Sequence, residues 1–168
     1  MSNYQYIQPA IAQFQAIPAE AEAPRIGCSA EEIAAMQATL PSGYQLPAAY
    51  LEFLSHAGKQ WGRLFGSHSM GYAQIFTMAK DRFSDYAEQV FVEDDEPAFP
   101  SEIFLIEEGN GSHFSFFKLD EGADPPVYQW KEKMEDFSEA VQIFPHYSLY
   151  LAAMVAEHAG VFEPPHQR

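Results

Sequence analysis

The chain has 168 residues, 47% hydrophobic and 15% aromatic, a composition that excludes a disordered protein and fits one packed domain. Asp and Glu number 24 against 9 Lys and Arg, which gives a formal charge of −15. Fifteen of the acidic residues lie between Glu88 and Glu139. Such a surface repels nucleic-acid phosphates and anionic lipids and attracts cationic partners, although acidity also serves solubility alone.

Cys28 is the only cysteine, which excludes an intrachain disulfide and a cysteine-based zinc site. The first residues show neither the basic start nor the unbroken apolar run of a secretion signal. No apolar run approaches the roughly 18 residues that span a membrane. We therefore expect a cytoplasmic protein.

The chain begins with a predicted N-terminal arm, residues 1–28, in which a short helix docks on the domain and a linker follows. Ser29 then opens a helix, and Glu32, three residues on, completes a capping box. Pro47 starts the next helix, and Gly58 is expected to end it in the left-handed conformation.

Residues 59–72 contain several glycines and predict a loop with short strands, and the apolar spacing of residues 79–92 predicts a helix. The clearest β pattern follows, in residues 101–130. An apolar run leads into the Gly109-Asn110-Gly111 turn, and two further strands return from it. A final helix is predicted over Tyr147–His158. Consecutive antiparallel strands among helices predict an α+β fold rather than the β-α-β alternation of nucleotide-binding proteins.

Several of these segments share the order of apolar and turn residues that is typical of one family. They are Leu40-Pro41, Leu46-Pro47, Tyr50, Phe53-Leu54 and Gly58, then Ile103-Phe104-Leu105, Gly109 with Gly111, Phe116 to Asp120, Val127-Tyr128-Gln129-Trp130, and Tyr147–Leu151. This order resembles the SUKH superfamily, which includes fungal cell-wall-synthesis regulators and bacterial immunity proteins. The resemblance covers residues 29–160 and leaves 161–168 as a C-terminal tail. Ala57-Gly58 stands where the family usually has Asn-Gly, and the N-terminal arm has no counterpart.

The resemblance implies a single α+β domain whose central, largely antiparallel sheet is surrounded by helices. It also implies a non-enzymatic protein-binding module without a cofactor. For bacterial members, the implied role is to neutralise a toxin domain encoded alongside. Many such toxins are nucleases with basic faces, and an acidic protein suits that target. A housekeeping adaptor of the same fold is the alternative.

Two groups of residues are candidates for the partner contact. The first is acidic and combines the run after the predicted 79–92 helix with the hairpin: Asp94, Asp95, Glu96, Glu107 and Glu108. The second is Trp61 and Arg63 with Phe65, residue types that are common in binding hot spots. The plain alternatives are a solvated charge run for the first group and packing over the core edge for the second.

Ser69 lies in Ser67-His68-Ser69-Met70-Gly71, close to the Gly-x-Ser-x-Gly elbow of hydrolases, and His113, His146 or His158 would serve as its base. The elbow needs a buried parallel strand before the serine, and Trp61–Gly66 does not predict one, so a polar loop is the better interpretation. The six histidines show no metal-binding spacing. We expect no catalytic and no metal site.

Overall fold

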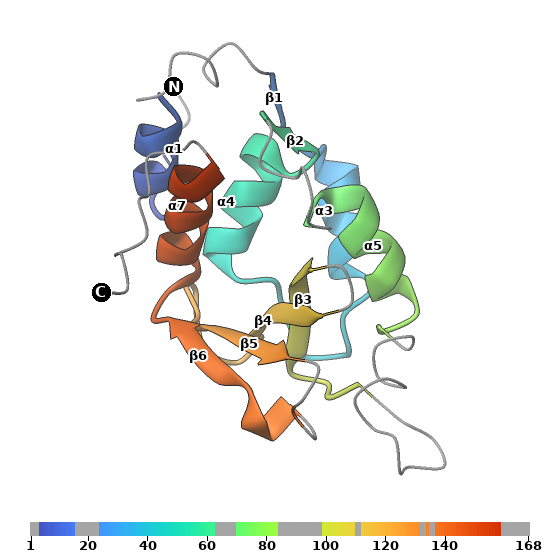
Figure 1. Cartoon of the computed structure of the whole chain (residues 1–168). Helices are drawn as coiled ribbons and strands as arrows, with labels where there is room; N and C mark the ends of the chain where they lie inside the picture. Colours follow the sequence, from blue (N-terminus) through green and yellow to red (C-terminus); the bar gives the residue numbers. More distant parts are fainter. Residues whose placement is uncertain are drawn as a thin grey trace, which may run out of the picture.

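The computed structural model describes residues 4–15, 24–62, 70–83, 99–109, 112–131, 134 and 137–158, which form five helices and two antiparallel sheets (Figure 1). The helices are α1 (Gln8–Gln15), α3 (Ala30–Gln37), α4 (Ala48–Ala57), α5 (Tyr72–Lys80) and α7 (Tyr147–His158). The strands are β1 (Arg25–Ile26), β2 (Gln60–Trp61), β3 (Ile103–Glu108), β4 (His113–Lys118), β5 (Val127–Lys131) and β6 (Val141–Phe144), and a 3-10 turn spans Phe137–Glu139. The predicted α+β class is confirmed.

The main sheet is the predicted meander, with strands in the order β3-β4-β5-β6 and every pair antiparallel. The residues expected inside it are at most 3% exposed: Ile103, Leu105, Phe116 and Val127. The edge strand β6 has no counterpart among the sequence predictions. Its first residue, Val141, is 56% exposed, and an edge strand of four residues carries little of the burial pattern that marks interior strands.

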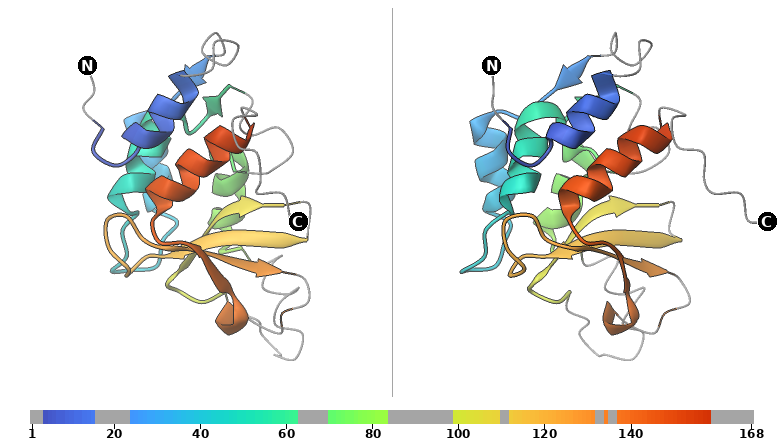
Figure 2. Two further views of the ribbon diagram at one scale, coloured as in Figure 1. Left: turned by 60° about the vertical axis from the view of Figure 1, so that its left-hand side comes forward. Right: turned by 90° about the vertical axis from the view of Figure 1, so that its left-hand side faces the viewer.

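Helices α4 and α7 cover one face of this sheet, and α1 packs beside α7 (Figure 2). Tyr50 of α4 contacts the stacked rings of Phe104 and Phe117 edge-on, with centroids 5.6 and 5.4 Å away, and Tyr147 of α7 joins the same cluster. Each of these rings is fully buried, which stabilises the fold by about 1.5–3 kcal/mol per side chain.

The opposite face of the sheet is also apolar. Neighbouring residues of a strand point to opposite sides, so Phe114 and Phe116 of β4 lie on the side away from Phe117. Phe114 stacks on Trp130 at 5.1 Å, and Phe116 stacks on Tyr128 at 5.6 Å. Burial on both faces explains why β3 begins with a continuous apolar run and why four successive residues of β4 are buried, with no alternating pattern.

The N-terminal arm is held by a carboxylate. The backbone N–H groups of Gln5, Tyr6 and Ile7 donate to the carboxylate of Glu52 on α4, at 2.7, 2.7 and 3.1 Å. This negative charge lies at the start of α1, where the helix dipole is positive. Ile7, with Ala10 and Ile11, is then buried in the common core.

One local prediction is wrong. Gly58 is not left-handed, since its φ of −58° and ψ of −26° are right-handed, and its N–H donates to the Leu54 carbonyl. Glycine is needed there for space, because a Cβ atom would lie 2.8 Å from the Leu54 backbone and 2.9 Å from the Cys28 sulfur.

The predicted 79–92 helix lies only partly within the described residues. There, α5 runs over Tyr72–Lys80 and ends in a turn at residues 81–83. Arg82 adopts a left-handed φ of 59°, and the N–H of Phe83 donates to the Met78 carbonyl at 2.8 Å. These features are a Schellman ending, in which glycine normally takes the left-handed position. The sequence has arginine there, so the usual stop signal is missing. Residues 84–92 lie outside the described part.

Candidate partner-binding surfaces

The residues predicted to contact a partner fall into two sets. Asp94, Asp95, Glu96 and Arg63 lie outside the described residues, as do Phe65 and Ser69. The structure places the other three. Glu108 ends β3 and is half-buried, whereas Glu107 and Trp61 are 3% and 1% exposed.

Glu107 lies in the interior between the sheet and α7. Its Oε2 accepts hydrogen bonds from the Ser115 hydroxyl at 2.7 Å and from the Tyr150 hydroxyl at 2.5 Å. Burial, followed by the charge of Glu107, raises the pKa of Tyr150 well above its ordinary value, so this phenol stays protonated and donates. Glu107 therefore joins α7 to the sheet, and we remove it from the predicted acidic face.

Trp61 also belongs to the core. Its ring stacks on Phe53 of α4, with centroids 6.2 Å apart, and meets the edge of His56 at 5.6 Å. It was a candidate hot spot because tryptophan is common at interfaces, but the same large apolar ring is equally suited to packing over a helix. We therefore remove Trp61 from the predicted contact as well.

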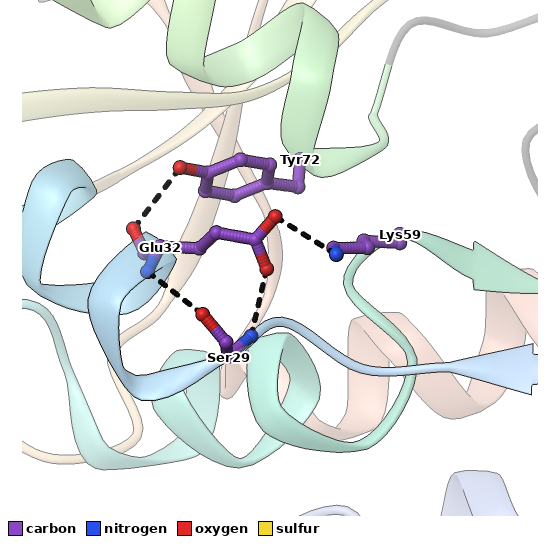
Figure 3. A network of polar contacts seen from close by, with 4 residues as sticks. All are labelled: Ser29, Glu32, Lys59 and Tyr72. Atoms are coloured by element: carbon purple, nitrogen blue, oxygen red, sulfur yellow. Dashed lines mark hydrogen bonds and ion pairs between the residues drawn. The ribbon is translucent and has the colours of Figure 1, made fainter.

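A polar cluster joins the starts of α3 and α5 to β2 (Figure 3). The predicted capping box is confirmed, with Ser29 N–H donating to Glu32 Oε2 at 2.7 Å and Glu32 N–H donating to Ser29 Oγ at 3.3 Å. The other carboxylate oxygen of Glu32 binds Lys59 Nζ at 2.8 Å, and the Tyr72 hydroxyl donates to the Glu32 carbonyl at 3.1 Å. The contacts of Lys59 and Tyr72 with Glu32 link separate segments of the chain.

Cys28 lies next to this cluster. Burial, aided by the charge of Glu32, raises the pKa of its thiol from 9.0 to about 11. Because the thiolate is the nucleophilic form, Cys28 is held in its unreactive form at neutral pH.

His56 has a neutral ring. Burial, followed by the charge of Arg25, lowers its pKa, and its Nε2 lies 3.2 Å from Arg25 Nη1. Among the described residues, no three His, Cys, Asp or Glu side chains gather closely enough to hold a metal ion.

A groove with a volume of about 560 Å³ lies at one end of the sheet, where the α3–α4 and β4–β5 connections run side by side (Figure 2). We call it the loop groove. It is lined by residues 43–48 and Leu51 on one side and by Leu119, Asp120, Gly122 and Ala123 on the other. Leu46 and Leu119 are buried in its floor, and Leu51 is half-buried.

The walls of the loop groove are held by specific hydrogen bonds. The side-chain amide of Gln37 donates to the Tyr44 carbonyl at 2.9 Å and accepts from the Leu46 N–H at 2.8 Å. The Ala49 N–H donates to the Ala123 carbonyl across the groove at 2.9 Å. The groove is therefore built before any ligand arrives.

Asp120 lines the loop groove, and Glu121 follows it in the chain; both side chains are exposed. The next carboxylate, Asp124, has a structural task, since it accepts from the Ser148 N–H at 2.9 Å and from the Ser148 hydroxyl at 2.6 Å. It thereby caps the start of α7 from a distance. The three carboxylates within five residues, at positions 120, 121 and 124, are a sequence signal of an acidic surface that the predicted contact does not include.

The described architecture agrees with a family model. The model of the SMI1 / KNR4 family (SUKH-1) matches residues 27–153, which is most of the chain and contains the meander, α3, α4, α5 and the start of α7. This chain belongs to the SMI1 / KNR4 family. The resemblance to the SUKH superfamily is thereby confirmed.

Membership of the SMI1 / KNR4 family fits a protein-binding module. No curated protein matches the chain. Among the described residues, no helix combines the length and apolar character needed to cross a bilayer.

Proposed function

We propose that this SUKH protein is an immunity protein that binds a cognate toxin domain in the cytoplasm and blocks it by contact. The proposed action needs neither catalysis nor a cofactor. The observation that carries the proposal is a formal charge of −15 on a member of a family that fits protein binding.

The charge favours a basic target. A toxin that cleaves nucleic acid must hold phosphates, so its active face carries Lys and Arg. An acidic protein approaches such a face faster than a neutral one, because opposite potentials steer the encounter. Covering that face also excludes the nucleic acid.

The proposed contact includes the acidic run Asp94, Asp95 and Glu96 together with Glu108, and Arg63 is kept as a separate candidate. Glu107 and Trp61 are left out because both are buried. This choice matters for the test, since reversing a buried charge would unfold the protein and imitate a loss of binding.

The experiment measures association kinetics with the toxin domain encoded next to this chain's gene. A variant with Asp94, Asp95, Glu96 and Glu108 changed to Lys should associate at least about tenfold more slowly at low salt. The difference should shrink at high salt, where steering is screened. Equal association rates at low salt would show that this acidity serves solubility alone. A gene neighbourhood without any toxin would favour the adaptor function instead.

A further inference from the structure

We propose that the loop groove receives a short cationic and apolar segment of a protein partner. An apolar side chain lies on the floor formed by Leu46, Leu51 and Leu119, and a Lys or Arg faces Asp120 and Glu121. This inference rests on the proposed protein-binding function, which it supplies with a second contact.

The floor of the groove supports an apolar anchor. Its volume of about 560 Å³ falls in the range of sites that hold a small ligand or a few side chains. Leu46 and Leu119 are 4% and 7% exposed, so they form a fixed base, and Leu51 projects from the first turn of α4 beside them. An anchor placed there removes apolar surface of both molecules from water.

The rigidity of the walls favours binding. Gln37 fixes one wall through both ends of its amide, and the Ala49–Ala123 hydrogen bond joins the two walls. Gly43 and Gly122 allow the backbone of the two walls to turn, with left-handed φ values of 93° and 95°. Residues other than glycine adopt such values only at a cost in free energy. A groove that is already ordered loses little entropy when a segment enters it.

The charge at the groove selects the occupant. Asp120 and Glu121 are exposed, and Glu121 keeps its place by accepting from the Tyr128 hydroxyl at 3.0 Å. The neighbouring cation, Lys118, has its Nζ 5.2 Å from the centroid of the Tyr128 ring. Two exposed carboxylates against one cation attract Lys or Arg and repel an acidic segment.

The direct test titrates the full-length ¹⁵N-labelled protein with short peptides at low salt. The probe is acetyl-Gly-Lys-Leu-Arg-Lys-Gly-amide, and the controls replace its Leu by Ser or its cations by Glu. The probe should shift the amide resonances of residues 43–51 and 119–124 in a saturable manner, and both controls should bind at least about fivefold more weakly. Shifts elsewhere, equal binding of a control, or equal displacement by spermidine would overturn the proposal. So would shifts that follow protein concentration without peptide, which would indicate a second copy in the groove.

Variants locate the site. Asp120→Lys reverses an exposed charge, and Leu51→Ser removes the half-buried part of the floor. Each should weaken probe binding at least about fivefold. Glu157→Lys makes the same charge change as Asp120→Lys on the exposed last turn of α7 and should alter binding less than about twofold. Folding of each variant is checked by its amide spectrum, and Asp120→Lys keeps the test valid if Leu51→Ser unfolds. Unchanged probe binding by both folded variants would overturn the inference.

The same variants separate this inference from the proposed function. If both variants still neutralise the toxin domain at wild-type affinity, immunity stands and the groove contact is wrong. If the probe binds in the groove but the wild-type protein does not bind the toxin domain, the groove is a binding site for a cationic and apolar segment and the proposed immunity function is wrong.

Discussion

The buried position of Glu107 makes a quantitative prediction for Glu107→Lys. Glu107 is 3% exposed, and its carboxylate accepts from two hydroxyl groups, of Ser115 and Tyr150, that are 0% and 2% exposed as residues. A lysine at this position removes the acceptor and buries an unpaired cation beside two polar groups. Breaking a buried interaction of this kind costs about 3–5 kcal/mol. Because a domain has only about 5–15 kcal/mol of stability, the variant should be close to unfolding.

The assay is urea unfolding followed by circular dichroism. Tyr150→Phe removes one donor and keeps the ring, so it should lower the free energy of unfolding by about 1.5–3 kcal/mol and remain measurable if Glu107→Lys does not fold. Glu157→Lys, on an exposed position of the same helix, should change it by less than about 0.5 kcal/mol. A Glu107→Lys protein as stable as wild type would refute the interior placement and return Glu107 to the candidate contact surface.

Three further predictions concern the framework. Asp124→Ala removes both hydrogen bonds to Ser148, so it should cost about 1–2 kcal/mol in urea unfolding, and no loss would contradict the remote cap. Gly27→Ala should cost about 1–3 kcal/mol or more, because its Cβ would lie 1.8 Å from the Ser55 carbonyl oxygen. A variant with an unchanged melting temperature would show that α4 does not approach so closely. Burial lowers the pKa of His56, so the folded state favours the neutral ring. The contribution of the neutral ring to the free energy of unfolding is therefore present above pH 6.5 and is lost as the pH falls toward the folded pKa. His56→Gln should therefore lose less stability than wild type between about pH 7 and pH 5.5, and an equal loss in both proteins would contradict the lowered pKa.

The elements that could be predicted are those whose signals are local. The capping box of Ser29 and Glu32 lies within four residues, and the Gly109–Gly111 turn and its flanking apolar runs specify a hairpin by themselves. The end of α5 could not be predicted, because Arg82 takes a position that usually needs glycine. The role of Gly58 depends on Leu54 and Cys28 together, and only the fold brings Cys28 to that position.

The candidate site shows the same division. The sequence shows that Glu107 and Asp120 are both acidic, but it does not show which of them is buried. The burial of Glu107 depends on Tyr150, which is 43 residues away along the chain. The loop groove depends on a backbone hydrogen bond between Ala49 and Ala123, which no local sequence pattern predicts. Charge therefore motivates the proposal of a basic partner, and the structure was needed to separate surface carboxylates from those that hold the fold together.

The most direct test of the central claim is protection of cells by co-expression. The toxin domain encoded next to this chain's gene is induced in bacteria with and without this protein, and survival and complex formation are measured together. The immunity function predicts that the wild-type protein restores growth and co-purifies with the toxin domain. It also predicts weaker protection from the variant with Asp94, Asp95, Glu96 and Glu108 changed to Lys. Cells that die equally with and without the protein, with no complex recovered, would contradict the account.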